Sequence, residues 1–261
     1  MDFPLTHWLF WTGALFVIVF LRYLVFSGGY DWLFTKKLRA RLGDRVFPRK
    51  SPANKLRRLE IIRSAGVSLI FAAFGIGLLW LWANGYTQLY DTLSGPRDWV
   101  WLFLGPILFL LTQETYYYWL HRWMHKPGIY EHVHKWHHES IETTAWTAFS
   151  FHPLEGFIQA AIIPLGALLI PMHVYAFLSL LALMTLSATI NHAGVEVFPK
   201  SWARSRVLSK LIGATHHDVH HKRAAYHFGL YFTFWDRWMG TELEDYARGT
   251  RSTSATGSSA L

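Results

Sequence analysis

Cysteine is absent from this chain of 261 residues. Without thiolates the protein cannot hold a thiolate-ligated haem, an iron–sulfur cluster or a cysteine-ligated zinc ion. The sequence also lacks the Gly-rich phosphate loop, the GxSxG nucleophile elbow and the HExxH helix of zinc proteases. Acidic residues are few, 17 against 25 Lys and Arg, but no DNA-binding or RNA-binding motif accompanies the basic excess. We therefore expect no nucleic-acid partner.

Hydrophobic residues make up 52% of the chain and are gathered into long blocks. The blocks at about 8–26, 61–83 and 99–120 each approach or exceed the roughly 18 to 20 residues needed to cross a hydrocarbon core. A fourth block, 156–190, is too long for one crossing and is interrupted at residues 170–173, which include Pro171. We therefore expect an all-α integral membrane protein with about four to five transmembrane helices, two of which form a short hairpin.

Basic residues are concentrated between the first two blocks. Eleven Lys and Arg lie between positions 36 and 63, opposed only by Asp44 and Glu60. The positive-inside rule predicts that this loop is cytoplasmic. Counting crossings, with 156–190 as a hairpin, returns the chain to that same side after residue 120 and again after residue 190. Both histidine-rich segments described next should therefore share one face of the membrane.

Eight histidines occur in short runs whose spacing suits a metal site. The runs are HxxxH at 121–125, HxxHH at 134–138 and HxxHH at 217–221. Side chains three or four residues apart meet on one face of a helix, and neutral imidazole is the commonest metal ligand. One zinc ion takes at most four protein ligands, so eight imidazoles predict two metal ions. Imidazole binds zinc, copper, nickel and iron alike, so spacing alone leaves the metal open.

The order of these motifs resembles a known family. HxxxH, HxxHH, an Asn-His-x-Gly element at 191–194 and HHxxHH at 216–221 are followed by Phe-Thr-Phe-Trp-Asp-Arg at 232–237. This pattern is similar to the fatty acid hydroxylase and sterol desaturase superfamily. Phe-His-Pro-Leu-Glu-Gly at 151–156 and the Pro-Met-His break most resemble sterol C5-desaturases. The resemblance runs from about residue 114 to residue 241.

That resemblance implies a membrane-bound, non-haem di-iron oxygenase. Such an enzyme uses two iron ions, O2 and electrons from cytochrome b5 or a ferredoxin with its reductase to desaturate or hydroxylate a lipid. The leading substrate is a sterol, and the alternative is a fatty acyl or carotenoid-type lipid. The implied location is a bacterial inner membrane or the endoplasmic reticulum. The implied metal ligands are His121, His125, His134, His137, His138, His192, His217, His220 and His221.

Three regions follow from these observations. Residues 1–98 would hold the first membrane spans and the basic loop, 99–246 the catalytic domain with its cytoplasmic, helical, histidine-rich di-metal cap, and 247–261 a disordered tail poor in apolar residues. Two other classes of function stay open: a membrane electron carrier with bis-histidine haem, and a metal-binding or metal-transport protein. The first would require isolated histidines facing each other in mid-span. The second would require histidines along a path through the bilayer.

Several further residues are left undecided by the sequence. His152 and His216 occupy positions that the family pattern marks but lack a clear ligand spacing, whereas His132 is better read as supporting or spare. His227 stands where the family usually has asparagine, so it either adds a ligand or replaces the hydrogen bond of that asparagine. Acidic groups that could orient the imidazoles are Glu131, Glu139, Glu196 and Asp218.

Overall fold

Long helices, each with one of its two ends in the same region, dominate the structure. The structure is a computed structural model that describes residues 5–48, 54–199, 201–202 and 205–243. The five longest are α1 (Leu5–Tyr30), α3 (Asn54–Ala83), α4 (Pro96–Met124), α7 (Pro153–Leu169) and α8 (Val174–His192). Helix α1 continues into a π-helical turn, η1 (Asp31–Lys37). The expected tail, 247–261, lies outside the described residues.

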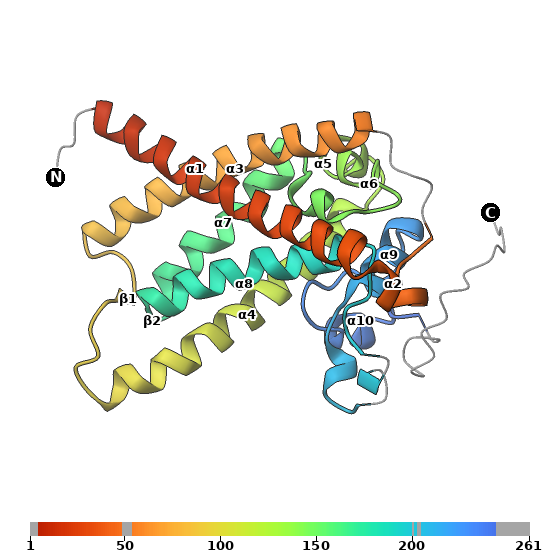
Figure 1. The fold of residues 1–261 in the computed structure, drawn as a ribbon. Coiled ribbons are helices and arrows are strands. Elements are labelled where there is room, and N and C mark those ends of the chain that lie inside the picture. The colour runs from red at the N-terminus through yellow and green to blue at the C-terminus, as the bar shows by residue number, and fades with distance from the viewer. Residues whose placement is uncertain (1–4, 49–53, 200, 203–204, 244–261) are drawn as a thin grey trace.

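Short elements make up the cap at the end of the long helices. After α1 come α2 (Arg39–Leu42) and η2 (Gly43–Arg45), and after α4 come α5 (Tyr130–Val133), α6 (Lys135–His138) and η3 (Ala145–Phe149). After α8 the chain forms η5 (Leu208–Lys210), α9 (Ala214–Lys222) and α10 (Phe234–Trp238). In Figure 1 these elements gather at the right, where α1, α4 and α8 end and α3 and α7 begin.

The expected break of the last apolar block is confirmed. The chain leaves α7 at Leu169, forms strand β2 (Met172–His173), and enters α8 at Val174. Strand β2 pairs in parallel with β1 (Leu89–Tyr90), the link between α3 and α4. Gly105 of α4 lies so close to this turn that a Cβ there would come within 2.3 Å of the carbonyl oxygen of Pro171. The turn is therefore fixed against two neighbouring segments.

Three helices of the described chain are long and apolar enough to cross a membrane: His7–Lys37, Lys55–Ala83 and Val174–His192. Helix α7 is apolar but shorter. Helix α4 covers the expected span 99–120, but its second half carries polar side chains, such as Gln113 and Glu114, that are buried inside the protein. The chain is thus a helical membrane protein whose spans surround a polar interior at one end.

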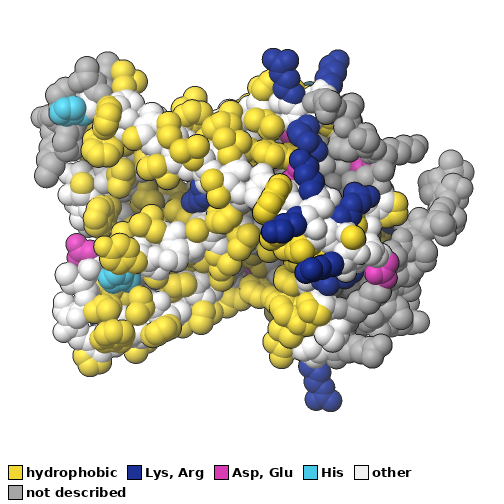
Figure 2. All heavy atoms as spheres, in the orientation of Figure 1, with side chains coloured by type: hydrophobic (Ala, Val, Ile, Leu, Met, Phe, Trp, Pro, Cys, Tyr) yellow, Lys and Arg dark blue, Asp and Glu magenta, His cyan; other side chains and the backbone are white. Residues whose placement is uncertain are grey.

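The basic segment and the histidine motifs lie at the same end of the molecule. Lys and Arg side chains crowd the right of Figure 2, whereas apolar side chains cover most of the rest of that face. Val46 forms a β-bridge with Val195, just beyond α8, and the Arg45 guanidinium donates to the carbonyl oxygen of Glu196 at 2.8 Å. The loop after α1 is therefore attached directly to the segment that follows His192.

Candidate metal centre

The nine histidines expected as ligands come together in two groups. One group has five members and the other has four, and within each group the candidate ligand atoms all lie within 4.8 Å of one another. We call them the five-histidine group (His121, His125, His134, His138 and His220) and the four-histidine group (His137, His192, His217 and His221). The histidines thus form two largely buried groups, not one large cluster, and each group could hold a metal ion.

Adjacent residues of one motif belong to different groups. His137 is in the four-histidine group, while His138 is in the five-histidine group. In α9, His217 and His221 serve the four-histidine group, and His220 turns to the other. The ring centroids of His138 and His221 are 4.6 Å apart, so the two groups are immediate neighbours. Helix geometry separates sequence neighbours such as His220 and His221, because residues four apart share a face and residues one apart do not.

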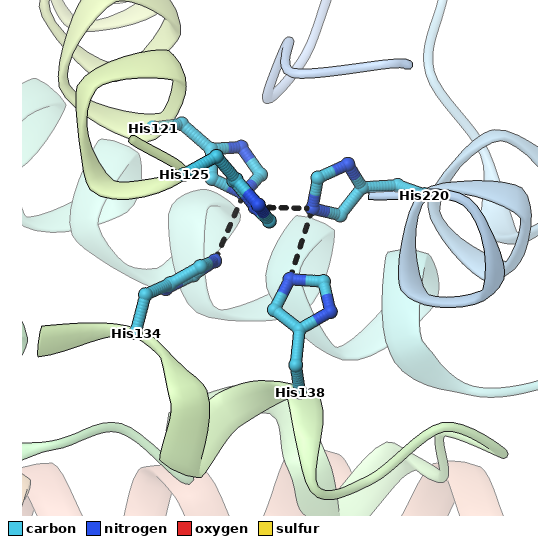
Figure 3. A group of neighbouring side chains, drawn as sticks. All are labelled: His121, His125, His134, His138 and His220. Carbon is cyan, nitrogen blue, oxygen red and sulfur yellow. Dashed lines mark hydrogen bonds between the residues drawn. The ribbon is translucent and has the colours of Figure 1, made fainter. Parts of the chain in front are cut away.

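Imidazole nitrogens converge inside each group. In the five-histidine group, Nε2–Nε2 distances of 3.1 Å join His121 to His134, and His220 to both His125 and His138 (Figure 3). In the four-histidine group, the Nε2 of His192 lies 3.1 Å from that of His137 and 2.8 Å from that of His217. Two ligand nitrogens on one ion, each about 2.1 Å from it, are roughly 3 Å apart. The observed spacings therefore fit nitrogens that share a cation.

Backbone carbonyls fix the tautomers of several rings and turn their lone pairs toward one another. A carbonyl oxygen only accepts, so the Nδ1–H of His192 must donate to Ala188 at 2.7 Å and that of His137 to Ser150 at 3.4 Å. In the neutral rings, both Nε2 atoms then carry lone pairs that face each other. Such a pair repels unless a cation lies between the nitrogens. His121 and His220 are held similarly, through the carbonyl oxygens of Phe228 and Tyr226.

Burial keeps the imidazoles of the cap neutral. It lowers the pKa of His134, His137, His217 and His221 well below the usual range, and neighbouring imidazoles lower it further. Burial likewise lowers the pKa of His220 to about 4. Near neutral pH these side chains therefore present lone pairs to a metal and not protons.

Glu155 supports the five-histidine group, although no ligand-like spacing marks it for that role. Its Oε1 lies 2.9 Å from Nδ1 of His134, and both side chains are fully buried. The Gln159 side chain donates to the same carboxylate at 2.9 Å. A carboxylate on the outer nitrogen of a ligand orients the ring and makes it a better donor to metal. The signal was present in the sequence as a lone acid in an apolar helix.

Two other buried carboxylates hold the backbone beside the site. Glu114 accepts from the amide nitrogens of Leu230, Tyr231 and Phe232, at 3.1, 2.6 and 3.2 Å. Asp236 accepts from the amides of Phe228 and Gly229, both at 2.9 Å, and from the hydroxyl of Thr241. These bonds fix the chain segment 228–232, whose Phe228 carbonyl orients His121.

A third carboxylate, Glu60 in α3, accepts from the hydroxyls of Ser140, Thr144 and Thr147. It ties the loop after α6 to a membrane-spanning helix. The partners of Glu60 and Glu114 lie about 80 or more residues away in the sequence, so no local motif marks the roles of these two carboxylates.

The acids expected to orient the imidazoles occupy other places. Glu131 pairs with Lys135, Glu139 with Arg63 and Asp218 with Lys222, each in an ion pair with an exposed or partly exposed member. The fourth, Glu196, accepts from the amide and the hydroxyl of Thr215 at the start of α9. It positions the helix that carries the last motif.

The undecided histidines lie outside both groups. His152 caps α7, because its Nδ1 accepts from the amide of Leu154, and His173 caps α8 in the same way. His216 accepts from the amide of Gly213 at 3.4 Å, and its ring meets that of His227 edge-on. His132 is exposed. His227 has a left-handed backbone, with φ of 58°.

Comparison with known proteins agrees with this site. The pattern of the family described as Fatty acid hydroxylase matches residues 106–241. A Delta(7)-sterol 5(6)-desaturase of Gibberella zeae is 30% identical over 238 residues, which cover 91% of this chain and 61% of that protein. Lathosterol oxidase of Rattus norvegicus is 32% identical over 167 residues, 64% of this chain and 54% of that protein.

The chain therefore spans between half and two thirds of the length of these relatives. No solved structure gives a significant match to it. The family match extends over more than half of the chain and includes all nine clustered histidines. The relatives compared above bear the names Delta(7)-sterol 5(6)-desaturase and lathosterol oxidase. The chain belongs to the fatty acid hydroxylase family.

Proposed function

We propose that the protein is a membrane-bound, non-haem di-iron oxygenase that uses O2 and an external electron donor to desaturate or hydroxylate a lipid. The observation that carries this proposal is the pair of adjacent, buried histidine groups, with five and four converging imidazoles. The expected ligands of one iron are the five-histidine group, and those of the other are the four-histidine group. Bound iron would supply the redox chemistry that O2 reduction and removal of hydrogen from an unactivated C–H bond require.

The side chains of the protein position and insulate such a centre. Carbonyl groups and Glu155 hold the outer nitrogens of the rings, so each inner nitrogen keeps its lone pair directed inward. Eight of the nine imidazoles are buried, and this excludes bulk water from the reaction. A bis-histidine haem is disfavoured, since a porphyrin needs two opposed rings with a wide gap between them and these rings crowd together.

A sterol is the substrate that we favour, and a fatty acyl or carotenoid-type lipid is the alternative. The similar proteins bear names of sterol desaturases and a lathosterol oxidase. An apolar cavity between the membrane helices, lined by Phe71, Leu78, Leu178 and Leu181, reaches His192 of the four-histidine group. A lipid in this cavity would approach the centre from within the bilayer.

We propose that the protein lies in a bacterial inner membrane or in the membrane of the endoplasmic reticulum. In either membrane the histidine end would face the cytoplasm. The support is the concentration of Lys and Arg at that end. An electron donor such as cytochrome b5 or a ferredoxin, with its reductase, would meet the protein on this face.

The test is lipid profiling by mass spectrometry after expression of the full chain in membranes with a donor and its reductase. Cells supplied with a Δ7-sterol should form a product that has lost two hydrogens or gained one oxygen, and His137→Ala and His220→Ala should abolish it. Purified protein should contain iron and show no Soret band. A Soret band, or one zinc ion per chain that neither substitution removes, would instead indicate an electron carrier or a metal-binding protein.

A further inference from the structure

The cavity that reaches His192 changes from polar to apolar along its length. It is formed by α1, α3, α4, α7 and α8 and has a volume of about 210 Å³. Its far part, toward the hairpin turn, is lined by Leu15, Leu78, Ile163 and Leu178. Leu178 precedes His192 by 14 positions in α8, so the cavity extends about 21 Å at 1.5 Å per helical residue.

Polar side chains of the cavity lie in the half nearer the histidines. Gln113 and Tyr117 lie in the second half of α4, and the ring centroid of Tyr117 is 5.0 Å from that of His121. Gln159 contacts Glu155, which in turn approaches His134. A molecule that matches this cavity carries a polar group at the end near the metal centre and an apolar body beyond it.

Arg22 is the charged side chain of this lining. It lies in membrane-spanning α1, and its Nε is buried without a hydrogen-bond partner among the described residues. The neighbouring Tyr23 packs with Ala148 and Ala188, and Ala188 lies one helical turn before His192. Arg22 therefore faces the cavity at its polar end. A guanidinium at membrane depth is costly unless it meets an acceptor, so its presence indicates a function.

The cavity opens sideways toward the lipid-facing surface. Ile18 of α1 and Leu178 of α8 both line it, and their exposed fractions are 60% and 54%. These two helices are neighbours in the fold. A membrane lipid could thus enter between α1 and α8 without passing through water.

We propose that Arg22 recognises the oxygen-bearing end of the substrate, which enters between α1 and α8 and comes to rest with its apolar body toward Leu178. The carbon that is oxidised would then lie within a few bonds of that oxygen, and not in the middle of a long chain. This inference rests on the proposed function. A sterol hydroxyl is the group that we favour; the carboxylate of a fatty acid shares the same hydrogen-bonding chemistry.

Binding to the full chain in phosphatidylcholine nanodiscs tests the inference without requiring turnover. The probes are a Δ7-sterol with a free 3-hydroxyl, the same sterol without that oxygen, and a long-chain fatty acid. The wild-type protein should bind the hydroxyl sterol about 10- to 100-fold more tightly than its deoxy counterpart, because a charged donor meets the oxygen. Arg22→Met should remove this preference, and Arg22→Lys should keep part of it.

Arg58→Met is the matched control, because Arg58 is exposed and lies outside the cavity. It should keep the full preference for the hydroxyl sterol. If the wild-type protein and a folded Arg22→Met variant prefer the hydroxyl sterol over its deoxy counterpart equally, the role of Arg22 is overturned. The proposed function would be unaffected by that result. If neither protein discriminates between the sterols and Arg22→Met changes the protein only in nanodiscs that contain anionic lipid, the partner of Arg22 is a phospholipid phosphate. That result would overturn the role of Arg22 in substrate binding. Tight binding of the fatty acid alone would support the role of Arg22 and overturn the sterol assignment, whereas binding of none of the probes would overturn both the role of Arg22 and the sterol assignment.

Discussion

Glu155 of α7 places its Oε1 2.9 Å from Nδ1 of His134, and neither side chain is accessible to solvent. His134 belongs to the loop that follows α4, whereas Glu155 begins the hairpin that extends away from the cap. Their contact joins the five-histidine group to the membrane helices. Replacement of this carboxyl group by an amide should therefore affect metal binding more than folding.

Glu155→Gln should lower metal affinity by about 10- to 100-fold, the usual effect of losing a carboxylate that orients a metal-bound imidazole. The replacement keeps nearly the same volume but is a weaker acceptor for the imidazole Nδ1–H. Competition with a chelator, followed by metal analysis of the membrane-embedded protein, measures the change. Glu139→Gln is the control, since Glu139 forms an exposed ion pair with Arg63. Equal metal retention by both variants would contradict a role for Glu155.

Because the histidines form two separate groups, substitution of a histidine in one group should remove one metal ion and leave the other. His220→Ala removes a nitrogen from the five-histidine group, and His137→Ala removes one from the four-histidine group. We expect each variant to fall from about two ions toward one, with the remaining ion in the untouched group. His152→Ala should keep both, because His152 caps α7 and lies outside the groups. Two ions in both ligand variants would rule out these assignments.

The histidines and the hairpin could be predicted from the sequence because both are local signals. Spacing of three and four residues brings rings together on a helix, and Pro171 interrupts a helix wherever it occurs. The assignment of each histidine to one group or the other depends on which face of α9 packs against each loop. Only tertiary packing decides this. The roles of Glu114, Glu155 and Asp236 are harder still to predict from the sequence. Their partners lie far away in the sequence or belong to the backbone.

Acid should destabilise the metal-free protein. Burial holds the pKa of His134, His137, His217 and His221 well below the ordinary value of 6.5 and lowers that of His220 to about 4. Below pH 6.5 these histidines bind protons in the unfolded chain but remain neutral in the folded chain. The free energy of unfolding therefore has its full value above pH 6.5 and decreases as the pH falls toward 4.

Thermal unfolding of the metal-free protein in detergent, measured from pH 8 to pH 4.5, checks this expectation. The melting temperature should be constant above about pH 7 and should decrease steadily below pH 6.5. His132→Gln should leave the profile unchanged, because His132 is exposed and lies outside the groups. A flat profile between pH 7 and pH 5 would mean that the buried imidazoles do not resist protonation.

His227 should prove replaceable by asparagine without loss of metal. Its backbone is left-handed, with φ of 58°, a conformation that asparagine adopts far more readily than most residues. The ring is buried but lies outside both histidine groups. His227→Asn should therefore keep two metal ions and an equal or higher melting temperature. His227→Val, in which a β-branched side chain meets the same φ, should lose about 1 to 2 kcal/mol of stability or more. Loss of one ion from a folded His227→Asn variant would instead make His227 a tenth ligand.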